Sequence, residues 1–223
     1  EALSKFCASV DWVPLPTDAF GVARYWRAIG GLATGMPYEF RWLRSREMVV
    51  RLQGLVGRVR FDVVHVDTLG LSPYVQLIPQ AGTVLNHHDI ESALVLRRAS
   101  GEQNFLWRAF WLQESANLLA AERRWCPTFD VNVVVSEDEG ALVRSSCGES
   151  DICVVPNGVD VRYFTPRRDP GGNRLLFCGR LDQLANRGAI TYFFNSIWPQ
   201  LSGKLKNLEI DVVGKNPPSW LIE

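Results

Sequence analysis

Arg180 is the side chain of this sequence that is best placed to bind an anion. It follows the apolar run 175–178 and Gly179, and is expected at the carboxyl end of a parallel strand, where open α/β sheets bind ligands. A guanidinium there can hold two phosphate oxygens at once and stabilise negative charge that develops on them. The residues therefore predict a phosphate-binding cation, and an ordinary surface arginine is the alternative.

Two further cations lie in the same part of the sequence. Arg187 and Gly188 are expected in the first turn of the next helix, where unpaired backbone N–H groups attract phosphate. Lys215 follows Gly214 after the last apolar run, within reach of a phosphate or ribose at the same edge. For Arg187 and Lys215 the alternative is a solvated surface side chain.

His87 and His88 form a pair directly after the apolar run 83–85. Neighbouring strand residues point to opposite faces of a sheet, so the two rings are not expected to bind one metal ion together. His65 lies inside another strand candidate, where a histidine is more often a hydrogen-bonded core residue than a ligand.

The cysteines indicate neither a disulfide framework nor a zinc site. They are five in number and contain no C-x-x-C pair, which fits a reducing cytosol. Cys153 and Cys178 lie in apolar strand candidates and are expected to be buried as small hydrophobic residues.

The elements that must position these residues read as repeated βαβ units. Short, nearly continuous apolar runs are typical of parallel strands that are buried on both faces, and helix-like stretches separate most of them. The expected strands are 63–66, 83–85, 131–135, 152–155, 175–178 and 208–213.

Helix starts are marked by capping residues. Ser45 is expected to cap a helix, and Ser136 with Glu139 forms a capping box. Capping also accounts for Glu91 and Ser92.

One long helix carries an aromatic stripe together with arginines. Its stripe residues are Trp107, Phe110, Trp111, Leu118 and Trp125. Such a stripe is more often the face packed on a sheet, and peripheral contact with anionic lipid is the second interpretation.

Bulk composition excludes some partners. The 24 basic and 24 acidic residues of the 223-residue chain cancel, so no nucleic-acid partner is expected. No apolar stretch approaches the ~18 residues that span a bilayer, and no secretion leader is visible. A cytoplasmic protein is expected, with attachment to the inner face of the membrane as the variant.

The sequence predicts two lobes joined by a linker. Residues 1–165 form the first lobe, the Pro- and Gly-rich segment 166–173 the linker, and residues 174–223 the beginning of the second. Asn157 and Gly158 tolerate unusual backbone conformations and are expected to form a hinge turn between the lobes.

Six short motifs follow one another in an order that is fairly specific. They are Phe61-Asp62-Val63-Val64-His65, Asn86-His87-His88-Asp89-Ile90-Glu91-Ser92, Val134-Val135-Ser136-Glu137, Pro156-Asn157-Gly158-Val159-Asp160, Gly179-Arg180-Leu181 and Val212-Val213-Gly214. Together they resemble the retaining GT-B glycosyltransferases of family four, most nearly those of bacterial exopolysaccharide gene clusters. The resemblance implies two Rossmann-like lobes with parallel sheets.

The resemblance implies roles for the polar residues. Arg180 and Arg187 would bind the diphosphate of a nucleotide-sugar donor, with Gly179, Gly188 and Lys215 beside them. The family usually has a lysine about five residues after the arginine that corresponds to Arg180. Here the second cation is an arginine, Arg187, and it lies two positions later than that lysine would.

On the other side, the resemblance implies that His88 faces the cleft and orients the transferred sugar, its neutral imidazole donating a hydrogen bond. The family pattern at this place resembles Asp-x-His-Asn. In this sequence its first and last polar residues are exchanged, giving Asn86 and Asp89. Ser136 matches a motif at the cleft edge.

The implied activity is metal-independent transfer, without a cofactor, from a nucleoside diphosphate sugar to a saccharide or lipid-linked acceptor in polysaccharide or cell-envelope biosynthesis. The family's first strand with its glycine-rich turn and its later Glu-x7-Glu pair are not in this sequence, so the chain reads as a fragment truncated at both ends and inactive by itself. Alternatives are a GT-B-like protein that hydrolyses or epimerises nucleotide sugars, and a noncatalytic binding module.

Overall fold

The computed structural model describes residues 3–15, 35–148, 150–165, 173–205 and 207–222. The chain divides into two compact units, Glu1–Gly158 and Val159–Glu223, and each is described by itself. Residues 166–172 of the expected linker lie outside the described residues, so a linker over 166–173 stays a prediction.

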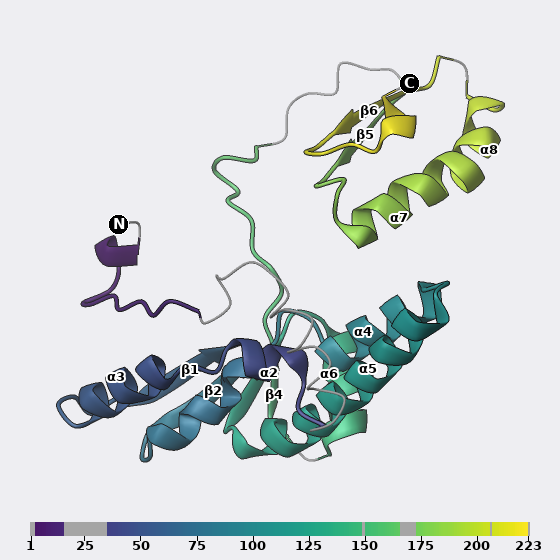
Figure 1. Ribbon diagram of the computed structural model, residues 1–223. Helices are drawn as coiled ribbons and strands as arrows, with labels where there is room; N and C mark the ends of the chain where they lie inside the picture. The colour runs from purple at the N-terminus through teal and green to yellow at the C-terminus, as the bar shows by residue number, and fades with distance from the viewer. Residues whose placement is uncertain (1–2, 16–34, 149, 166–172, 206, 223) are drawn as a thin grey trace. The chain divides into compact units, whose positions relative to one another are not determined.

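The first unit contains a parallel four-stranded sheet in the order β1-β2-β3-β4 (Figure 1). The expected α/β fold with parallel sheets is confirmed, because every neighbouring pair in this sheet is parallel. Each strand falls on a run that the sequence indicated. The strands are β1 (Val63–Asp67), β2 (Gly82–Asn86), β3 (Val131–Val134) and β4 (Ile152–Val154).

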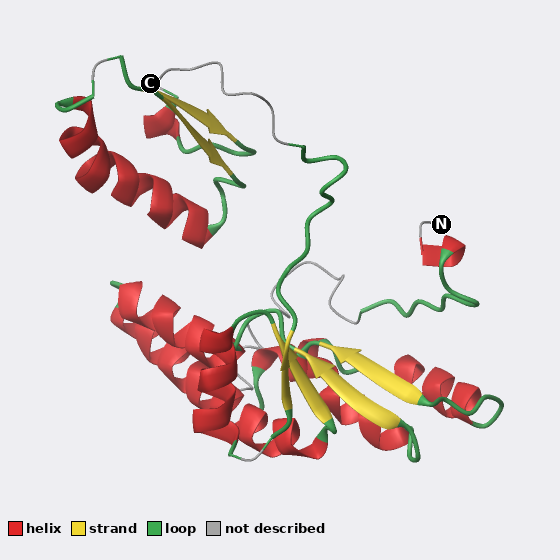
Figure 2. Cartoon of the chain, turned by 180° about the vertical axis from the view of Figure 1, so that it is seen from behind, coloured by secondary structure: helices red, strands yellow, loops and turns green. Residues whose placement is uncertain are grey.

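Helices connect these strands and pack on the sheet (Figure 2). Two consecutive helices, α4 (Glu91–Gly101) and α5 (Phe105–Trp125), are joined by three residues and lie side by side as a hairpin. Between the strands also lie η2 (Leu69–Leu77), η3 (Cys126–Thr128) and α6 (Glu137–Cys147), whereas η1 (Leu3–Lys5), α2 (Tyr38–Trp42) and α3 (Arg46–Val56) precede β1.

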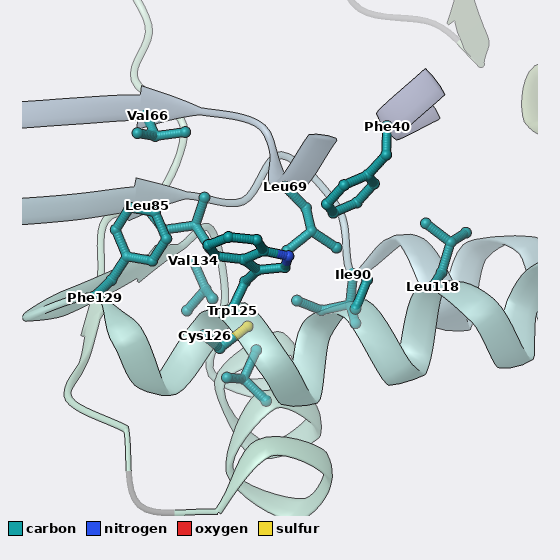
Figure 3. Packing of buried hydrophobic residues seen from close by; sticks show 12 residues of the cluster. Phe40, Val66, Leu69, Leu85, Ile90, Leu118, Trp125, Cys126, Phe129 and Val134 are labelled. Carbon is teal, nitrogen blue, oxygen red and sulfur yellow. The ribbon is translucent and has the colours of Figure 1, made fainter. Parts of the chain in front are cut away.

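The core of this unit forms where the hairpin and η3 meet the sheet (Figure 3). Leu85 and Val134 from the central strands are fully buried, and Trp125, Cys126 and Phe129 pack around them. Burial of side chains of this size stabilises a fold by about 1.5–3 kcal/mol each. The packing fixes the carboxyl ends of β1 and β2 relative to α4 and α5.

Two of the three expected caps are present. Ser45 Oγ accepts a hydrogen bond from Met48 N at 3.3 Å. Ser136 Oγ accepts from Glu139 N at 3.3 Å. The capping interpretation of Glu91 and Ser92 is wrong, because α4 starts after Ile90 without a side-chain cap and both side chains bind elsewhere.

The second unit contains a parallel pair, β5 (Arg174–Cys178) and β6 (Glu209–Val213). A helical segment joins them as α7 (Leu184–Tyr192), the π-helical turn η4 (Phe193–Ile197) and α8 (Trp198–Ser202), and η5 (Ser219–Leu221) follows β6. The π turn lies just before Pro199, which has no N–H for the regular helical bond.

Burial on both strand faces, which the apolar runs predicted, does not hold for β5. Exposed and partly buried residues alternate along it, and Leu176 is 69% exposed. The burial expected for Cys153 and Cys178 is also wrong, since both thiols are exposed. A run of apolar letters sets strand propensity, whereas burial depends on which face another element covers.

Candidate functional site

A pocket of about 960 Å³ lies between α2, α4 and α5 in the first unit. Its lining is aromatic and acidic. The aromatic lining residues are Tyr38, Trp42, Trp107, Phe110 and Trp111, and the ionisable ones are Glu39, His88, Asp89, Glu91, Arg98, Glu102 and Glu114. Most of the predicted stripe therefore faces a pocket, with the buried Leu118 also in its lining, while Trp125 at the end of α5 is buried in the core.

Two pocket carboxyls share the hydroxyl of Thr68. Thr68 Oγ1 lies 2.7 Å from Glu39 Oε1 and 3.0 Å from Glu91 Oε1. A hydroxyl has one proton to donate, so the second contact needs a proton on a carboxyl. Burial, followed by the hydrogen bond and charge of Glu39, raises the pKa of Glu91 to about 9. Glu91 is therefore protonated at neutral pH.

The backbone around this group is specialised. Thr68 has φ 133°, a region that β-branched residues avoid and that typically costs about 1–3 kcal/mol. Two residues on, a Cβ at Gly70 would lie 2.7 Å from Glu39 Cγ. Glycine at that position lets the Glu39 side chain pack against η2, next to Thr68.

Two more glutamates from α5 are buried nearby. Glu114 is 7% exposed, and its Oε1 accepts from Tyr38 N at 2.6 Å. Glu122 is 2% exposed and accepts from Ser92 N at 2.9 Å and Ser92 Oγ at 2.5 Å. Burial is the main cause that raises the pKa of each.

His88 lies at the rim of the pocket, at the carboxyl end of β2. Its Nε2 is 3.0 Å from Asp67 Oδ1, at the end of β1, and Asn86 Nδ2 donates to the same oxygen at 2.7 Å. The hydrogen bond from Asn86 is the main cause that lowers the pKa of Asp67. His65 Nε2 is 3.9 Å from Asp67 Oδ1. The His65 ring is exposed, so its interpretation as a core residue is wrong.

The two adjacent histidines point apart, as the strand geometry predicted. The side chain of His88 is 65% exposed, whereas His87 as a residue is 3% exposed. His87 Nε2 lies 3.1 Å from Asn132 Oδ1, and burial lowers the pKa of the ring. His87 is therefore a neutral core residue.

In the second unit, Arg180 belongs to an exposed polar cluster after β5. Its Nη2 and Nε lie 2.9 and 3.2 Å from the two oxygens of Asp182, and Asn216 Nδ2 donates to Asp182 Oδ2 at 2.9 Å. The bond from Arg180 is the main cause that lowers the pKa of Asp182 to about 2. The same bond raises the pKa of Arg180.

The backbone brings Lys215 to the same strand ends as Arg180. Leu181 N donates to Lys215 O at 3.0 Å, so the segments after β5 and β6 run together. Gly214 is required there, because a Cβ would lie 1.9 Å from Gly179 O. Arg187 and Gly188 lie in the first part of α7, both exposed.

The remaining predicted residues lie apart from these groups. Ser136 caps α6. Asn157 and Gly158 are exposed and form no turn, and Gly158 is not in the left-handed region. The turn follows instead at 161–163, where Asp160 Oδ1 accepts from Arg162 N and Tyr163 N. A hinge role for 157–158 stays a prediction.

The buried glutamates are the residues that the sequence interpretation missed. One signal was available, because Glu114, Leu118 and Glu122 follow one another at four-residue spacing on one face of a long helix. Two carboxyls within an apolar stripe indicate buried acids. Thr68 had a positional signal, because Asp67 and Thr68 directly follow an expected strand. Glu39 carried no signal, since nothing local links it to Glu91.

Comparisons with known proteins give a family match. The family described as Glycosyltransferase Family 4 matches residues 13–163. No curated protein matches the chain. Among solved structures, sucrose-phosphate synthase from Thermosynechococcus elongatus is similar, with a TM-score of 0.49 and 14% identity over 82% of this chain and 52% of that one. The chain thus spans about half the length of that structure.

Neither a membrane-spanning helix nor a metal-binding cluster is present among the described residues. No helix among them is long and apolar enough to cross a bilayer. Within the same residues, no three histidine, cysteine or acidic side chains are placed to hold a metal ion.

Proposed function

The chain belongs to glycosyltransferase family 4, and from this premise we propose that it serves sugar transfer from a nucleoside diphosphate sugar to a saccharide or lipid-linked acceptor, with retention. The sugar C1–O bond to the diphosphate breaks, and the diphosphate leaves with the electron pair. The acceptor oxygen bonds to C1 on the same face, and its proton passes to the leaving diphosphate. A GT-B architecture and a role in polysaccharide assembly belong to the same proposal.

The position of His88 is the observation that carries this proposal. His88 lies within the family match, at a strand end and on the rim of the pocket. Because Asp67 is ionised, Nε2–H of His88 must donate to it. A neutral ring then offers Nδ1 to a sugar hydroxyl as an acceptor. A hydrogen bond that the neutral imidazole donates to the transferred sugar, as expected from the sequence, stays a prediction.

Arg180 is proposed to bind the donor diphosphate. Its Nε and one N–H of Nη2 face Asp182, so the second edge of the planar fork is made by Nη1 and the other N–H of Nη2. The pair with Asp182 fixes the orientation of the guanidinium, so an anion that binds at this edge meets a cation already in place. Arg187 and Lys215 would add positive charge at the same strand ends, in a mechanism that needs no metal ion.

The test compares matched arginine variants in the complete protein. Arg174 pairs with Asp211 at 2.7 and 3.2 Å at the other end of β5 and serves as the control. Arg180→Ala is expected to lower the transfer rate by about 100- to 1,000-fold, and Arg174→Ala to leave it unchanged. Equal rates in both variants would rule out the phosphate role.

A second matched pair tests the first unit. His88→Ala is expected to lower the transfer rate, whereas His65→Ala, which removes a more distant ring from the same Asp67, should not.

The alternative functions are tested by analysing the products of the reaction with and without acceptor. Turnover that needs no acceptor would replace transfer by hydrolysis or epimerisation, and absence of donor binding would favour a noncatalytic module.

A further inference from the structure

The charge balance of the pocket in the first unit selects against anions. Its lining carries five carboxyls, from Glu39, Asp89, Glu91, Glu102 and Glu114, and one guanidinium, from Arg98. Arg98 lies against Trp111, its guanidinium carbon 3.9 Å from the ring centroid. A diphosphate would meet an excess of negative or proton-sharing groups here, so the pocket suits a ligand that is neutral or cationic.

The pocket walls supply faces that attract a cation. Trp107, Phe110 and Trp111 follow one another along α5, with ring centroids 4.8–6.4 Å apart. Arg98 shows that this wall already holds a cation. Indole faces attract ammonium groups and also pack against the apolar face of a pyranose ring.

No cation is among the groups that shift the pKa of Glu91, whereas Arg41 on α2 lies close enough to Glu114 to offset part of the rise that burial causes. Glu91 Oε2 is buried without a hydrogen-bond partner among the described residues, and Glu114 is nearly buried. Burial raises the pKa of both groups. A cation that entered the pocket would restore the ionised state by pairing with them, and a proton would be released to solvent.

We propose that this pocket binds the protonated amine of an amino-sugar acceptor, with its pyranose ring against the aromatic wall. The proposal rests on the proposed transferase function and names the acceptor class for it. The volume of about 960 Å³ is within the range of small-molecule sites. His88 on the rim would then meet a hydroxyl of the same ligand.

The test measures binding separately from transfer. Methyl glucosaminide, methyl N-acetylglucosaminide and methyl glucoside are titrated into the complete protein at pH 7 and followed by NMR. The amine is expected to bind about tenfold more tightly than the two neutral sugars, as one charge-assisted hydrogen bond would give. Equal binding of all three, or preference for a neutral sugar, overturns the proposal.

Two variants test whether a pocket carboxyl causes the preference for the amine, and calorimetry tests whether binding releases a proton. Glu114→Gln keeps an acceptor for Tyr38 N and is expected to abolish the preference for the amine. Glu137→Gln, on the exposed start of α6, should retain it. Calorimetry in buffers of different ionisation heat should show proton release on binding of the amine by the unsubstituted protein. Absence of that release contradicts the mechanism.

Failure of this inference is distinguishable from failure of the proposed function. If the protein transfers sugar to a neutral acceptor and shows no preference for the amine, the proposed transferase function stands and the amino-sugar acceptor is ruled out. Amine binding without transfer to any acceptor would retain the pocket's specificity and remove the function.

Discussion

Two carboxyl groups, one in each unit, lie in opposite surroundings. Glu91 in the first unit is largely buried beside Glu39 and shares the hydroxyl of Thr68, and its pKa rises to about 9. Asp182 in the second unit is solvated and faces Arg180 and Asn216, and its pKa falls to about 2. The same functional group is thus an acid held neutral in one unit and a fixed anion in the other.

The difference indicates what each region can do. An exposed ion pair adds little to stability, so the Arg180–Asp182 pair mainly orients a guanidinium. Burial outweighs the nearby cations and disfavours the charged forms of Glu91 and Glu114, so the pocket of the first unit is set to respond to a further cation or to a change of pH. The first unit selects a ligand by desolvation, and the second by presenting charge.

The largest effect should come from the strand ends of the second unit. Gly214→Ala places a Cβ 1.9 Å from Gly179 O, a backbone atom that cannot turn aside. We expect a loss of about 3 kcal/mol in the free energy of unfolding, measured by urea titration. Gly188→Ala, where a Cβ meets nothing within 4 Å, should be neutral or slightly stabilising. Similar losses for both variants would contradict the close approach.

The buried acids of the first unit predict the next effect. Ser92→Ala removes the hydroxyl 2.5 Å from Glu122 Oε2 and leaves a buried acceptor one donor short. The free energy of unfolding should fall by about 2 kcal/mol. Ser145→Ala, which removes an exposed hydroxyl that donates to Leu142 O, is the control and should change it little. An equal loss in the free energy of unfolding for Ser145→Ala and Ser92→Ala would contradict this prediction.

The opposite pKa shifts predict different pH profiles. A carboxyl whose pKa is raised on folding binds more protons in the native state, so stability is full below the unfolded pKa and falls as pH rises towards about 9 for Glu91. The fall is at most about 1.4 kcal/mol per pH unit for one proton. Glu91→Gln should flatten the urea-midpoint profile between pH 5 and 9.

Asp182 supplies the control for that profile. Its lowered pKa contributes stability above the unfolded value, and that contribution is lost only as pH falls towards about 2. Asp182→Asn should therefore leave the slope between pH 5 and 9 unchanged. If the slope changed in Asp182→Asn, or stayed the same in Glu91→Gln, the assignment of this pH dependence to Glu91 would be wrong.

The smallest effect concerns the exposed pair itself. Arg180→Ala should leave the unfolding midpoint within experimental error of the unsubstituted protein, because both partners of the pair are solvated. A clear loss of stability, measured by the same urea titration, would make Arg180 a structural residue and would weaken its proposed role in donor binding.

Much of the scaffold could be predicted from the sequence. The six apolar runs form strands in parallel pairs, and Ser45 and Ser136 cap helices. The opposed directions of His87 and His88 also followed from strand geometry. These features depend on neighbours within a few residues, where backbone geometry alone sets the outcome.

The candidate pocket could be predicted only in part. The aromatic residues of α5 were identified, but their packing against a sheet was the favoured interpretation. Glu91 does begin α4, but its side chain was interpreted as a helix cap, although its partners Glu39 and Thr68 are 52 and 23 positions away in the chain. Loop closure over such distances leaves no local pattern in the sequence.

The sequence by itself determined which segments become strands and helices, where helices begin, and which cation follows β5. Tertiary structure decided which side chains lose water. It placed Glu39, Thr68 and Glu91 together and exposed His65, Cys153 and Cys178. The physical reason is that local conformation depends on backbone sterics and nearby hydrogen bonds, whereas burial and pKa depend on which distant element covers a residue.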